Sequence, residues 1–475
     1  MKHFFYKGKN NVLQSKDLEE FGEKIKIVKK DFSKLLESRN LSFLIGSGCS
    51  LGAHGIPTMM KLAEGFFEPT EEITLAMSPK LRGLILSDES KKLLGEYKIA
   101  FNQDPFVKNL ETFLGTLYSL RFYLEQIKDD VQLVKVDIVI NETKHFILYQ
   151  CLNKDNEGKD IDIQNNYKSF YRKLSLRDSN LPKPNVFTTN YDLYSEKAMD
   201  ELGITYTNGF SGFIERYFNP SIFNYALAEQ MDVSSSKWNV IDSYVYLFKI
   251  HGSVNWIEVE DSNKLFRIKE LQDSKFEFLK EQTNLMIYPS PIKQNASLGT
   301  PYTDLFREFQ KRIAQNQSVL VTMGYSFADE HINNLIFQAL TIPTFRLVIF
   351  SDLGYHSDGK HISTKANIEK LKALNDPRIW IIGSDDETNS HQVTIDQEDT
   401  TVLPTTTSLD EETFEKPETT TTTPAGKSEK HLHFFNTICD DLLPDWSENI
   451  IEDHNEQILN LINSKKSNSE GATND

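Results

Sequence analysis

The sequence predicts an α/β protein with a doubly wound, Rossmann-like parallel sheet and an inserted helical subdomain. Strand-sized apolar runs alternate with helical patterns, most regularly between residues 303 and 382, and this alternation implies βαβ crossovers in a parallel sheet. The first run, Leu41–Ile45, ends in a glycine-rich turn. The stretch 68–180 is too long for a connection inside a compact sheet, so we expect it to form a subdomain.

The N-terminal region begins the main domain. Apolar residues recur at spacings of three and four along residues 15–39, which predicts an amphipathic helix. The strand Leu41–Ile45 follows, and its glycine-rich turn allows the backbone to approach a ligand closely. Thr58 is expected to cap a helix that ends near Phe67.

The insertion 68–180 is expected to be mainly helical. Helical patterns occur around 91–101 and 109–128, and an alternating apolar segment lies near 131–140. Cys151 is expected to be a small buried apolar residue within a helix rather than a reactive thiol.

The second half of the chain supplies the remaining core. Gly203 stands where a helix C-cap is expected. The expected helices are 193–202, 303–314, 330–340 and 364–374. The expected strands are Asn185–Thr189, Val245–Ile250, Leu285–Tyr288, Ser318–Met323, Phe345–Phe350 and Ile379–Ile382. In a doubly wound sheet, ligands bind beyond the carboxyl ends of the strands.

The composition changes near the C-terminus. Residues 387–430 are rich in Thr, Asp, Glu and Pro, which predicts a disordered linker. Residues 431–475 carry enough apolar side chains for a short helical segment. The main domain therefore comprises 1–67 and 181–386.

Composition also excludes several classes of protein. No apolar run is long enough to span a membrane, and the first residues become polar too soon for a signal peptide. The three cysteines are far apart, which disfavours a disulfide framework and fits a cytoplasmic protein. The net charge of −17 argues against a broad nucleic-acid surface, but local basic patches leave direct nucleic-acid binding open.

Four short motifs occur in order along the chain. They are Gly46-Ser47-Gly48-Cys49-Ser50, Gly55-Ile56-Pro57, Thr188-Thr189-Asn190-Tyr191-Asp192 and His251-Gly252. Together they resemble the sirtuin motifs G-A-G-x-S, G-I-P, T-Q-N-x-D and H-G. The resemblance spans roughly residues 40–385 and identifies the main domain as a sirtuin-like, NAD-binding catalytic domain.

The resemblance implies a role for each motif. Asn190 would position a ribose hydroxyl or a water molecule, His251 would act on the ribose as a general base or orienter, and Asp192 would brace the loop that carries Asn190. Met323-Gly324-Tyr325-Ser326 stands where the family has a turn that holds the adenosine ribose. The implied NAD-binding residues are Gly46, Ser47, Gly48, Ser50, Thr189, Gly324 and Ser326.

Two departures from the sirtuin deacylases change the expected reaction. Residues 252–330 contain no cysteine, so the four-cysteine zinc ribbon of the deacylases is absent and no metal is expected. Thr189 also replaces the family glutamine. The chain looks instead like the sirtuin-like domains of bacterial antiviral defence systems, which hydrolyse NAD. Its size is similar to relatives that pair with a HerA-type ATPase, and a homo-oligomer is expected.

Three alternatives to an NAD glycohydrolase remain open. One is a zinc-independent protein deacylase or ADP-ribosyltransferase, which would consume an acceptor together with NAD. Another is a nucleotide-sensing subunit that binds without turnover. The third is a nuclease subunit of a defence complex, although no paired-carboxylate metal motif stands out.

Overall fold

The computed structural model describes residues 2–14, 20–178, 180–228, 240–241, 243–259, 267–282, 300–353, 366–385 and 430–444. The expected strand Leu285–Tyr288 and nearly all of the expected linker lie outside these residues, as does the chain after residue 444. None of the described helices is both long and apolar enough to cross a bilayer.

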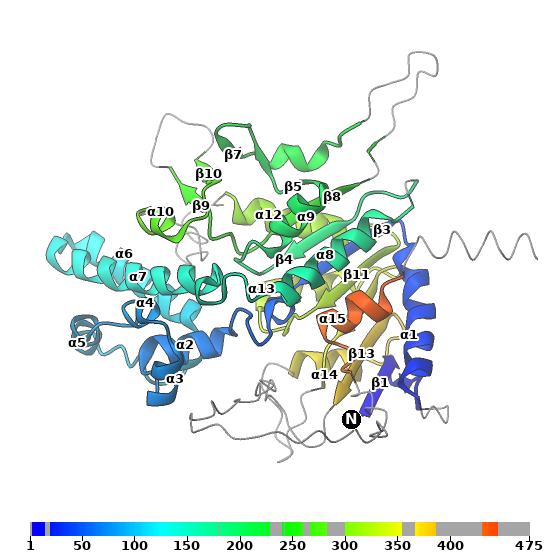
Figure 1. Cartoon of the computed structure of the whole chain (residues 1–475), viewed down its shortest axis with the longest axis horizontal. Coiled ribbons are helices and arrows are strands. Elements are labelled where there is room, and N and C mark those ends of the chain that lie inside the picture. Colours follow the sequence, from blue (N-terminus) through cyan, green and yellow to red (C-terminus); the bar gives the residue numbers. More distant parts are fainter. Residues whose placement is uncertain are drawn as a thin grey trace, which may run out of the picture.

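A nine-stranded sheet forms the centre of the protein (Figure 1). Its order is β2-β1-β13-β12-β11-β3-β4-β8-β5. The strands from β13 to β5 are parallel neighbours, whereas β1 and β2 run antiparallel at one edge. The fold class predicted from the sequence is therefore confirmed. The strands are β1 (Lys2–Lys7), β2 (Asn10–Asn11), β3 (Asn40–Ile45), β4 (Asn185–Thr188), β5 (Thr205–Thr207), β8 (Tyr244–Lys249), β11 (Ser318–Met323), β12 (Arg346–Phe350) and β13 (Ile379–Asp385).

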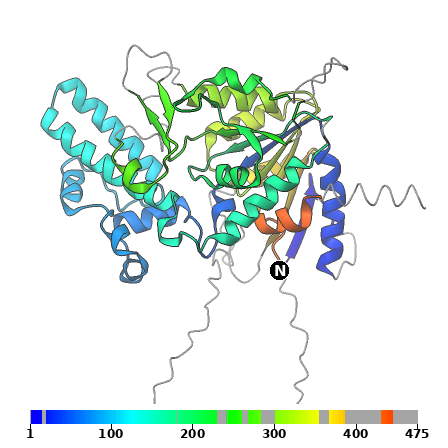
Figure 2. The same cartoon turned by 45° about the horizontal axis from the view of Figure 1, so that its top comes forward.

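Helices cover both faces of this sheet (Figure 2). Alternate strand residues point to opposite faces, so Phe43 and Leu44 of β3 belong to different cores. One face packs against α1 (Phe21–Leu36), α8 (Ile161–Ser175) and α9 (Tyr194–Leu202). The other packs against α12 (Tyr302–Ile313), α13 (Glu330–Ala339) and α14 (Ala366–Ala373).

The insertion forms a helical body beside the sheet, around a third core to which residues outside the insertion, such as Tyr191 and Phe276, also contribute. The segment 131–140 is helical, because it lies within the long helix α7. Residues of α8, which the sequence grouped with the insertion, pack instead on the main sheet. Helix α2 (Met59–Phe67), which the sequence grouped with the main domain, also packs in this third core. The helices of the insertion itself in this body are α3 (Glu71–Ala76), α4 (Pro79–Arg82), α5 (Asp88–Glu96), α6 (Leu110–Ile127) and α7 (Asp130–Cys151).

A second, small sheet has the order β6-β7-β10-β9 and was not predicted from the sequence. Its strands are β6 (Phe210–Ser211), β7 (Arg216–Phe218), β9 (Trp256–Glu258) and β10 (Ile268–Glu270), with α10 (Phe276–Lys280) after it. Strands of two or three residues give too little alternation to be recognised in a sequence.

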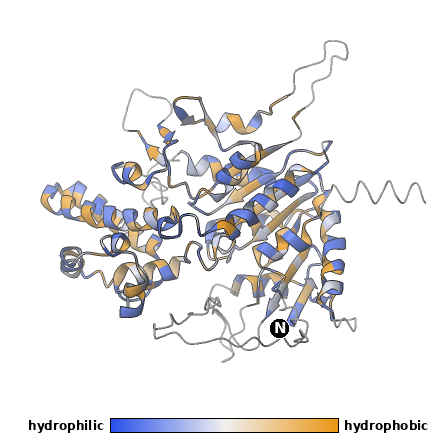
Figure 3. Cartoon of the chain, viewed as in Figure 1, coloured by the Kyte–Doolittle hydropathy of each residue, from blue (hydrophilic) through white to orange (hydrophobic). Residues whose placement is uncertain are grey.

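Local sequence signals at two helix ends act as expected. Thr58 Oγ1 accepts a hydrogen bond from the Lys61 backbone N–H at 3.4 Å and caps α2. Gly203 ends α9 with φ +66°, in the left-handed region that suits glycine. Figure 3 shows alternating apolar and polar residues along several helices, the pattern from which they were predicted.

Candidate active site

Four loops meet at the carboxyl edge of the main sheet. Ile45 at the end of β3 is in register with Thr188 of β4 and with Met323 of β11. Thr188 is in register with Lys249 of β8. Because β3 lies between β11 and β4, this edge is the point where a doubly wound sheet binds ligands.

Three glycines allow the loop after β3 and the loop after β11 to pack backbone against backbone. The backbone N–H of Gly46 donates to Met323 O at 2.9 Å, and that of Gly48 donates to Gly324 O at 2.9 Å. A Cβ added at Gly48 would lie 2.7 Å from Gly324 Cα. Gly324 has φ +60°, and a Cβ there would lie 2.5 Å from Cys49 N. The close approach of the two loops therefore explains why residues without a Cβ stand at these positions.

The other expected NAD-binding residues differ in exposure. Ser47, in the 3₁₀ turn Ser47–Ser50, and Ser326 are exposed, so both hydroxyls can reach a ligand outside the edge. Thr189 is half-buried, and its backbone N–H donates to Ile45 O at 3.1 Å. Ser50 is buried and already hydrogen-bonded within the protein.

Asn190 is held in the centre of the site by its amide nitrogen. Nδ2 donates to Gly46 O and Ser50 Oγ, each at 3.1 Å, and lies 3.4 Å from the Tyr167 hydroxyl. The residue is 7% exposed. Its Oδ1 atom is buried and has no hydrogen-bond partner among the described residues. An unpaired buried acceptor is costly unless a ligand or water donates to it.

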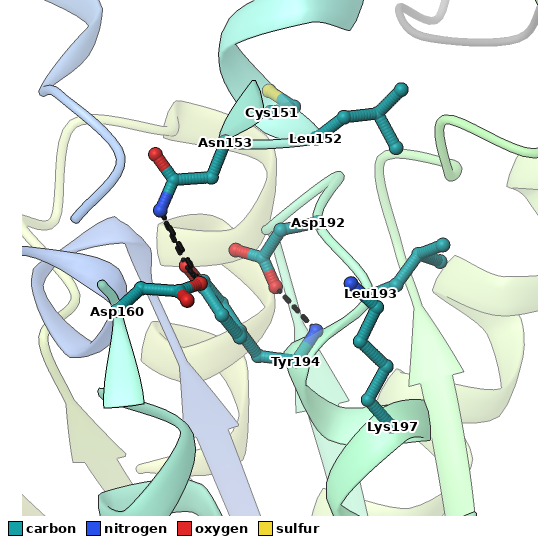
Figure 4. Close-up of a pocket in the computed structure, with 8 residues that line it drawn as sticks. All are labelled: Cys151, Leu152, Asn153, Asp160, Asp192, Leu193, Tyr194 and Lys197. Carbon is teal, nitrogen blue, oxygen red and sulfur yellow. Dashed lines mark hydrogen bonds between the residues drawn. The ribbon is translucent and has the colours of Figure 1, made fainter. Parts of the chain in front are cut away.

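Asp192 braces the loop that carries Asn190. Its Oδ2 accepts from Ser50 Oγ at 2.8 Å. Its Oδ1 accepts from the Tyr194 N–H at 3.1 Å, as Figure 4 shows. Burial raises the pKa of Asp192, although the charge of Lys249 and both hydrogen bonds oppose that rise. Asp192 therefore joins the glycine-rich turn to the Asn190 loop and is a positioning residue.

The fully buried Lys249 also holds the loop that carries Asn190. Lys249 Nζ donates to the carbonyl oxygens of Tyr191 and Asp192, and to Glu196 Oε1 at 3.0 Å. Its side chain is 0% exposed and that of Glu196 is 10% exposed. Lys249 lies within the expected strand Val245–Ile250, and nothing in the local sequence indicates this contact.

His251 pairs with a carboxylate that the sequence analysis missed. His251 Nε2 lies 2.8 Å from Asp329 Oδ2. Asp329 is also the N-cap of α13, because its Oδ1 accepts from the N–H groups of His331 and Ile332 at 2.8 and 3.0 Å. The only sequence signal was an aspartate at a predicted helix start, and that signal points to capping alone.

The pair shifts the pKa of both groups. Burial lowers the pKa of His251, but the Asp329 hydrogen bond and the charges of Glu111 and Asp329 outweigh it, so the pKa is raised. Burial raises the pKa of Asp329, but His251 and the two α13 N–H groups outweigh it, so the pKa is lowered. The histidine is thus oriented by a carboxylate, an arrangement that suits proton transfer.

A small cavity lies behind the Asp192 loop (Figure 4). Its volume of about 10 Å³ is about the space of one water molecule. Tyr194 contributes a hydroxyl there that donates to Asp160 Oδ2 at 2.6 Å and accepts from Asn153 Nδ2 at 2.9 Å. The cavity is a polar network that supports the loop, and it is too small for a nucleotide.

All three cysteine side chains are buried. Burial raises the pKa of Cys49, Cys151 and Cys439, which keeps these thiols protonated. The described part of the chain contains no group of three or more His, Cys, Asp or Glu side chains arranged to hold a metal ion.

A family model matches part of the chain. The model of the SIR2-like domain family matches residues 184–343, a range that includes Asn190, His251 and Asp329. No curated protein matches the chain. SIR2-like domains typically use NAD, so the match supports NAD-related activity in general. Residues 184–343 and the mostly parallel sheet around them thus support a Sir2-like fold for this chain.

Proposed function

We propose that the chain is an NAD glycohydrolase that cleaves the nicotinamide–ribose bond to give nicotinamide and ADP-ribose. The observation that carries the proposal is the buried, unpaired Oδ1 of Asn190 at the carboxyl edge of a Sir2-like sheet. A ribose hydroxyl or a water molecule would satisfy this acceptor, so the site fits a group that donates a hydrogen bond there.

The chemistry needs water, a held ribose and a proton acceptor. Water adds to C1′ of the ribose, the bond from C1′ to the nicotinamide nitrogen breaks with its electron pair going to nicotinamide, and one proton is released. Asn190 would position the hydroxyl or water, and His251 in its neutral form would take the proton. Asp329 would keep the imidazole in its orientation.

Hydrolysis is favoured over acyl transfer by the sequence around the site. Residues 252–330 contain no cysteine for the zinc ribbon of the deacylases, and Thr189 replaces their glutamine. Neither departure removes a residue that water attack requires.

The proposal is tested by NAD consumption with Asn190→Ala. Chromatography should detect nicotinamide and ADP-ribose in equal amounts with the wild type and almost none with the variant. Asn165→Ala, at an exposed site on α8, is the matched control and should keep the wild-type rate. Consumption of an acyl peptide or labelling of a protein acceptor together with NAD would favour the deacylase or transferase instead. Wild-type rates from Asn190→Ala would refute the assignment.

We further propose that the enzyme acts in antiviral defence in the cytoplasm, as a homo-oligomer gated by a HerA-type ATPase partner. An NAD hydrolase must be restrained in healthy cells, and assembly is one way to restrain it. The outer side of α7 supports self-association, because Val131, Val134 and Ile138 are 69%, 58% and 51% exposed. Their spacing places them in one stripe along the helix, here called the α7 stripe.

A second copy is the occupant that we assign to the α7 stripe. Helix α7 carries apolar residues on several faces, and a helix of that kind is normally covered on several sides. Two copies can bury their stripes against each other around a two-fold axis, since an isologous contact needs only one self-complementary surface.

A further inference from the structure

The C-terminal segment, residues 430–444, is part of the main core. It contains the short helix α15 (Phe435–Thr437) and a π-helical turn (Ile438–Leu442). Residues 386–429 separate it in sequence from the end of β13. Its buried apolar side chains belong to the same core as β3, α1 and α8; they are Leu432, Phe435, Ile438, Cys439, Leu442 and Leu443.

Polar contacts also fix the segment in place. Leu432 N–H donates to Ser384 Oγ at 2.9 Å, and Ser384 N–H donates to His433 Nδ1 at 3.2 Å. Lys173 of α8 donates to the carbonyl oxygens of Asp440 and Leu443 at 3.2 and 3.1 Å. The segment is therefore bound to both β13 and α8.

One side chain of the segment reaches the support of the active site. The Phe435 ring packs edge-on against Tyr167, with 5.1 Å between centroids, and contacts Phe170 at 5.8 Å. The hydroxyl of Tyr167 lies 2.9 Å from Ser50 Oγ and 3.4 Å from Asn190 Nδ2. Tyr167 thus stands between the C-terminal segment and Asn190.

Tyr167 has another aromatic neighbour. Its ring stacks on Tyr194 at 5.5 Å between centroids, and Tyr167 is 1% exposed. In a close-packed core, removing one neighbour of a ring gives that ring room to shift. Phe435 is the neighbour that comes from the far end of the chain.

We propose that the C-terminal segment positions Asn190 through Tyr167, so that the NAD site is complete only when residues 430–444 are docked. Phe435 and Tyr167 are positioning residues, and neither needs to touch the substrate. The kinetic test of this proposal rests on the proposed function, because it measures NAD hydrolysis. A second test measures hydrogen–deuterium exchange in the protein without substrate and needs no activity.

The test compares two adjacent phenylalanines in the full-length chain. Phe435 is 6% exposed and packs on Tyr167, whereas Phe434 is 48% exposed. Hydrogen–deuterium exchange should rise in the peptides that cover 46–51 and 186–193 for Phe435→Ala. It should stay at the wild-type level for Phe434→Ala. If Phe435→Ala does not fold, Phe435→Leu serves, because it keeps an apolar side chain and removes the ring.

Kinetics separates positioning from binding. Phe435→Ala and Tyr167→Phe should each lower kcat about tenfold to a hundredfold, the range expected when a reacting group is misplaced by less than about 1 Å, with a smaller change in KM. Combined in one chain, the two should lose much less than the product of the single effects, since both act on the same hydroxyl.

The outcomes are distinguishable from failure of the proposed function. If the wild type consumes no NAD, that function fails, and the exchange measurement still decides the inference. If Phe435→Ala leaves exchange unchanged at 46–51 and 186–193, the inference is overturned. Wild-type kcat in Tyr167→Phe, in an enzyme that does hydrolyse NAD, overturns it as well.

Discussion

Replacing Asp329 by Asn separates the two roles of this side chain. Its Oδ1 caps α13 by accepting from His331 N–H and Ile332 N–H, and its Oδ2 faces His251 Nε2 at 2.8 Å. In Asp329→Asn the amide oxygen can keep the cap, so the amide nitrogen replaces the oxygen that faces the histidine. A nitrogen donor there requires Nε2 to accept, which moves the proton of neutral His251 to Nδ1.

The size of the effect follows from this change of tautomer. With Nδ1 protonated and Nε2 bound to the amide, neither ring nitrogen is free to act as a base. Loss of a positioned general base typically costs about 10²–10⁴-fold in rate, and we expect kcat to fall within this range. Stability should change little because the cap remains, whereas Asp329→Ala should lose about 1 kcal/mol of unfolding free energy with the cap.

The pH profile supplies a second, independent signature. Asp329 contributes both a hydrogen bond and a charge that raise the pKa of His251, while burial lowers it. A general base acts in its neutral form, so the acid limb of wild-type kcat should have its midpoint above about 6.5. In Asp329→Asn the residual activity should have its acid limb at lower pH.

The assay is kcat for NAD consumption from about pH 5.5 to 9, with unfolding by denaturant measured in parallel. Asp329→Ala is the companion variant, since it removes the cap and the carboxylate together. If Asp329→Asn keeps the kcat and the acid limb of the wild type, Asp329 does not orient His251 for catalysis. Its role would then be limited to capping α13.

Three other predictions concern packing and assembly. Gly324→Ala should destabilise the protein by at least about 2 kcal/mol in denaturant unfolding, because φ is +60° and a Cβ would meet Cys49 N. Gly95→Ala in α5, where nothing lies within 4 Å of the added Cβ, should be neutral or stabilising, and equal effects would contradict the packing argument. Lys249→Met should lower the free energy of unfolding by about 3–5 kcal/mol, because it leaves Glu196 unpaired. Adding Glu196→Gln should recover part of that loss. A loss below about 1 kcal/mol would show that the ion pair is dispensable for stability. Val134→Glu should reduce the oligomer mass in light scattering, whereas Leu374→Glu, at an exposed site outside the α7 stripe, should not. An unchanged oligomer in Val134→Glu would exclude the α7 stripe as the contact.

The sequence alone determined six of the nine strands of the main sheet and which residues stand at their ends; β1, β2 and β5 were not predicted. The predicted strand Ser318–Met323 has the observed bounds of β11, and the expected helix 303–314 differs from α12 by one residue at each end. These features are local, since burial on one or both faces imposes a period that appears in the order of residues. The same reasoning placed Asn190, His251 and Gly324 after strand ends, where parallel register brings them to one edge.

Only the tertiary structure decided which side chains meet. Asp329 reaches His251 from the start of a helix far along the chain, and Phe435 reaches Tyr167 from beyond residues 386–429. The edge strand β1 pairs antiparallel with β13 although the two lie at opposite ends of the main domain. Such contacts depend on strand order and on loop conformation, which local periodicity does not encode. For the same reason the sequence did not reveal that Gly46 and Gly48, two of the residues expected to bind NAD, pack against the Gly324 loop.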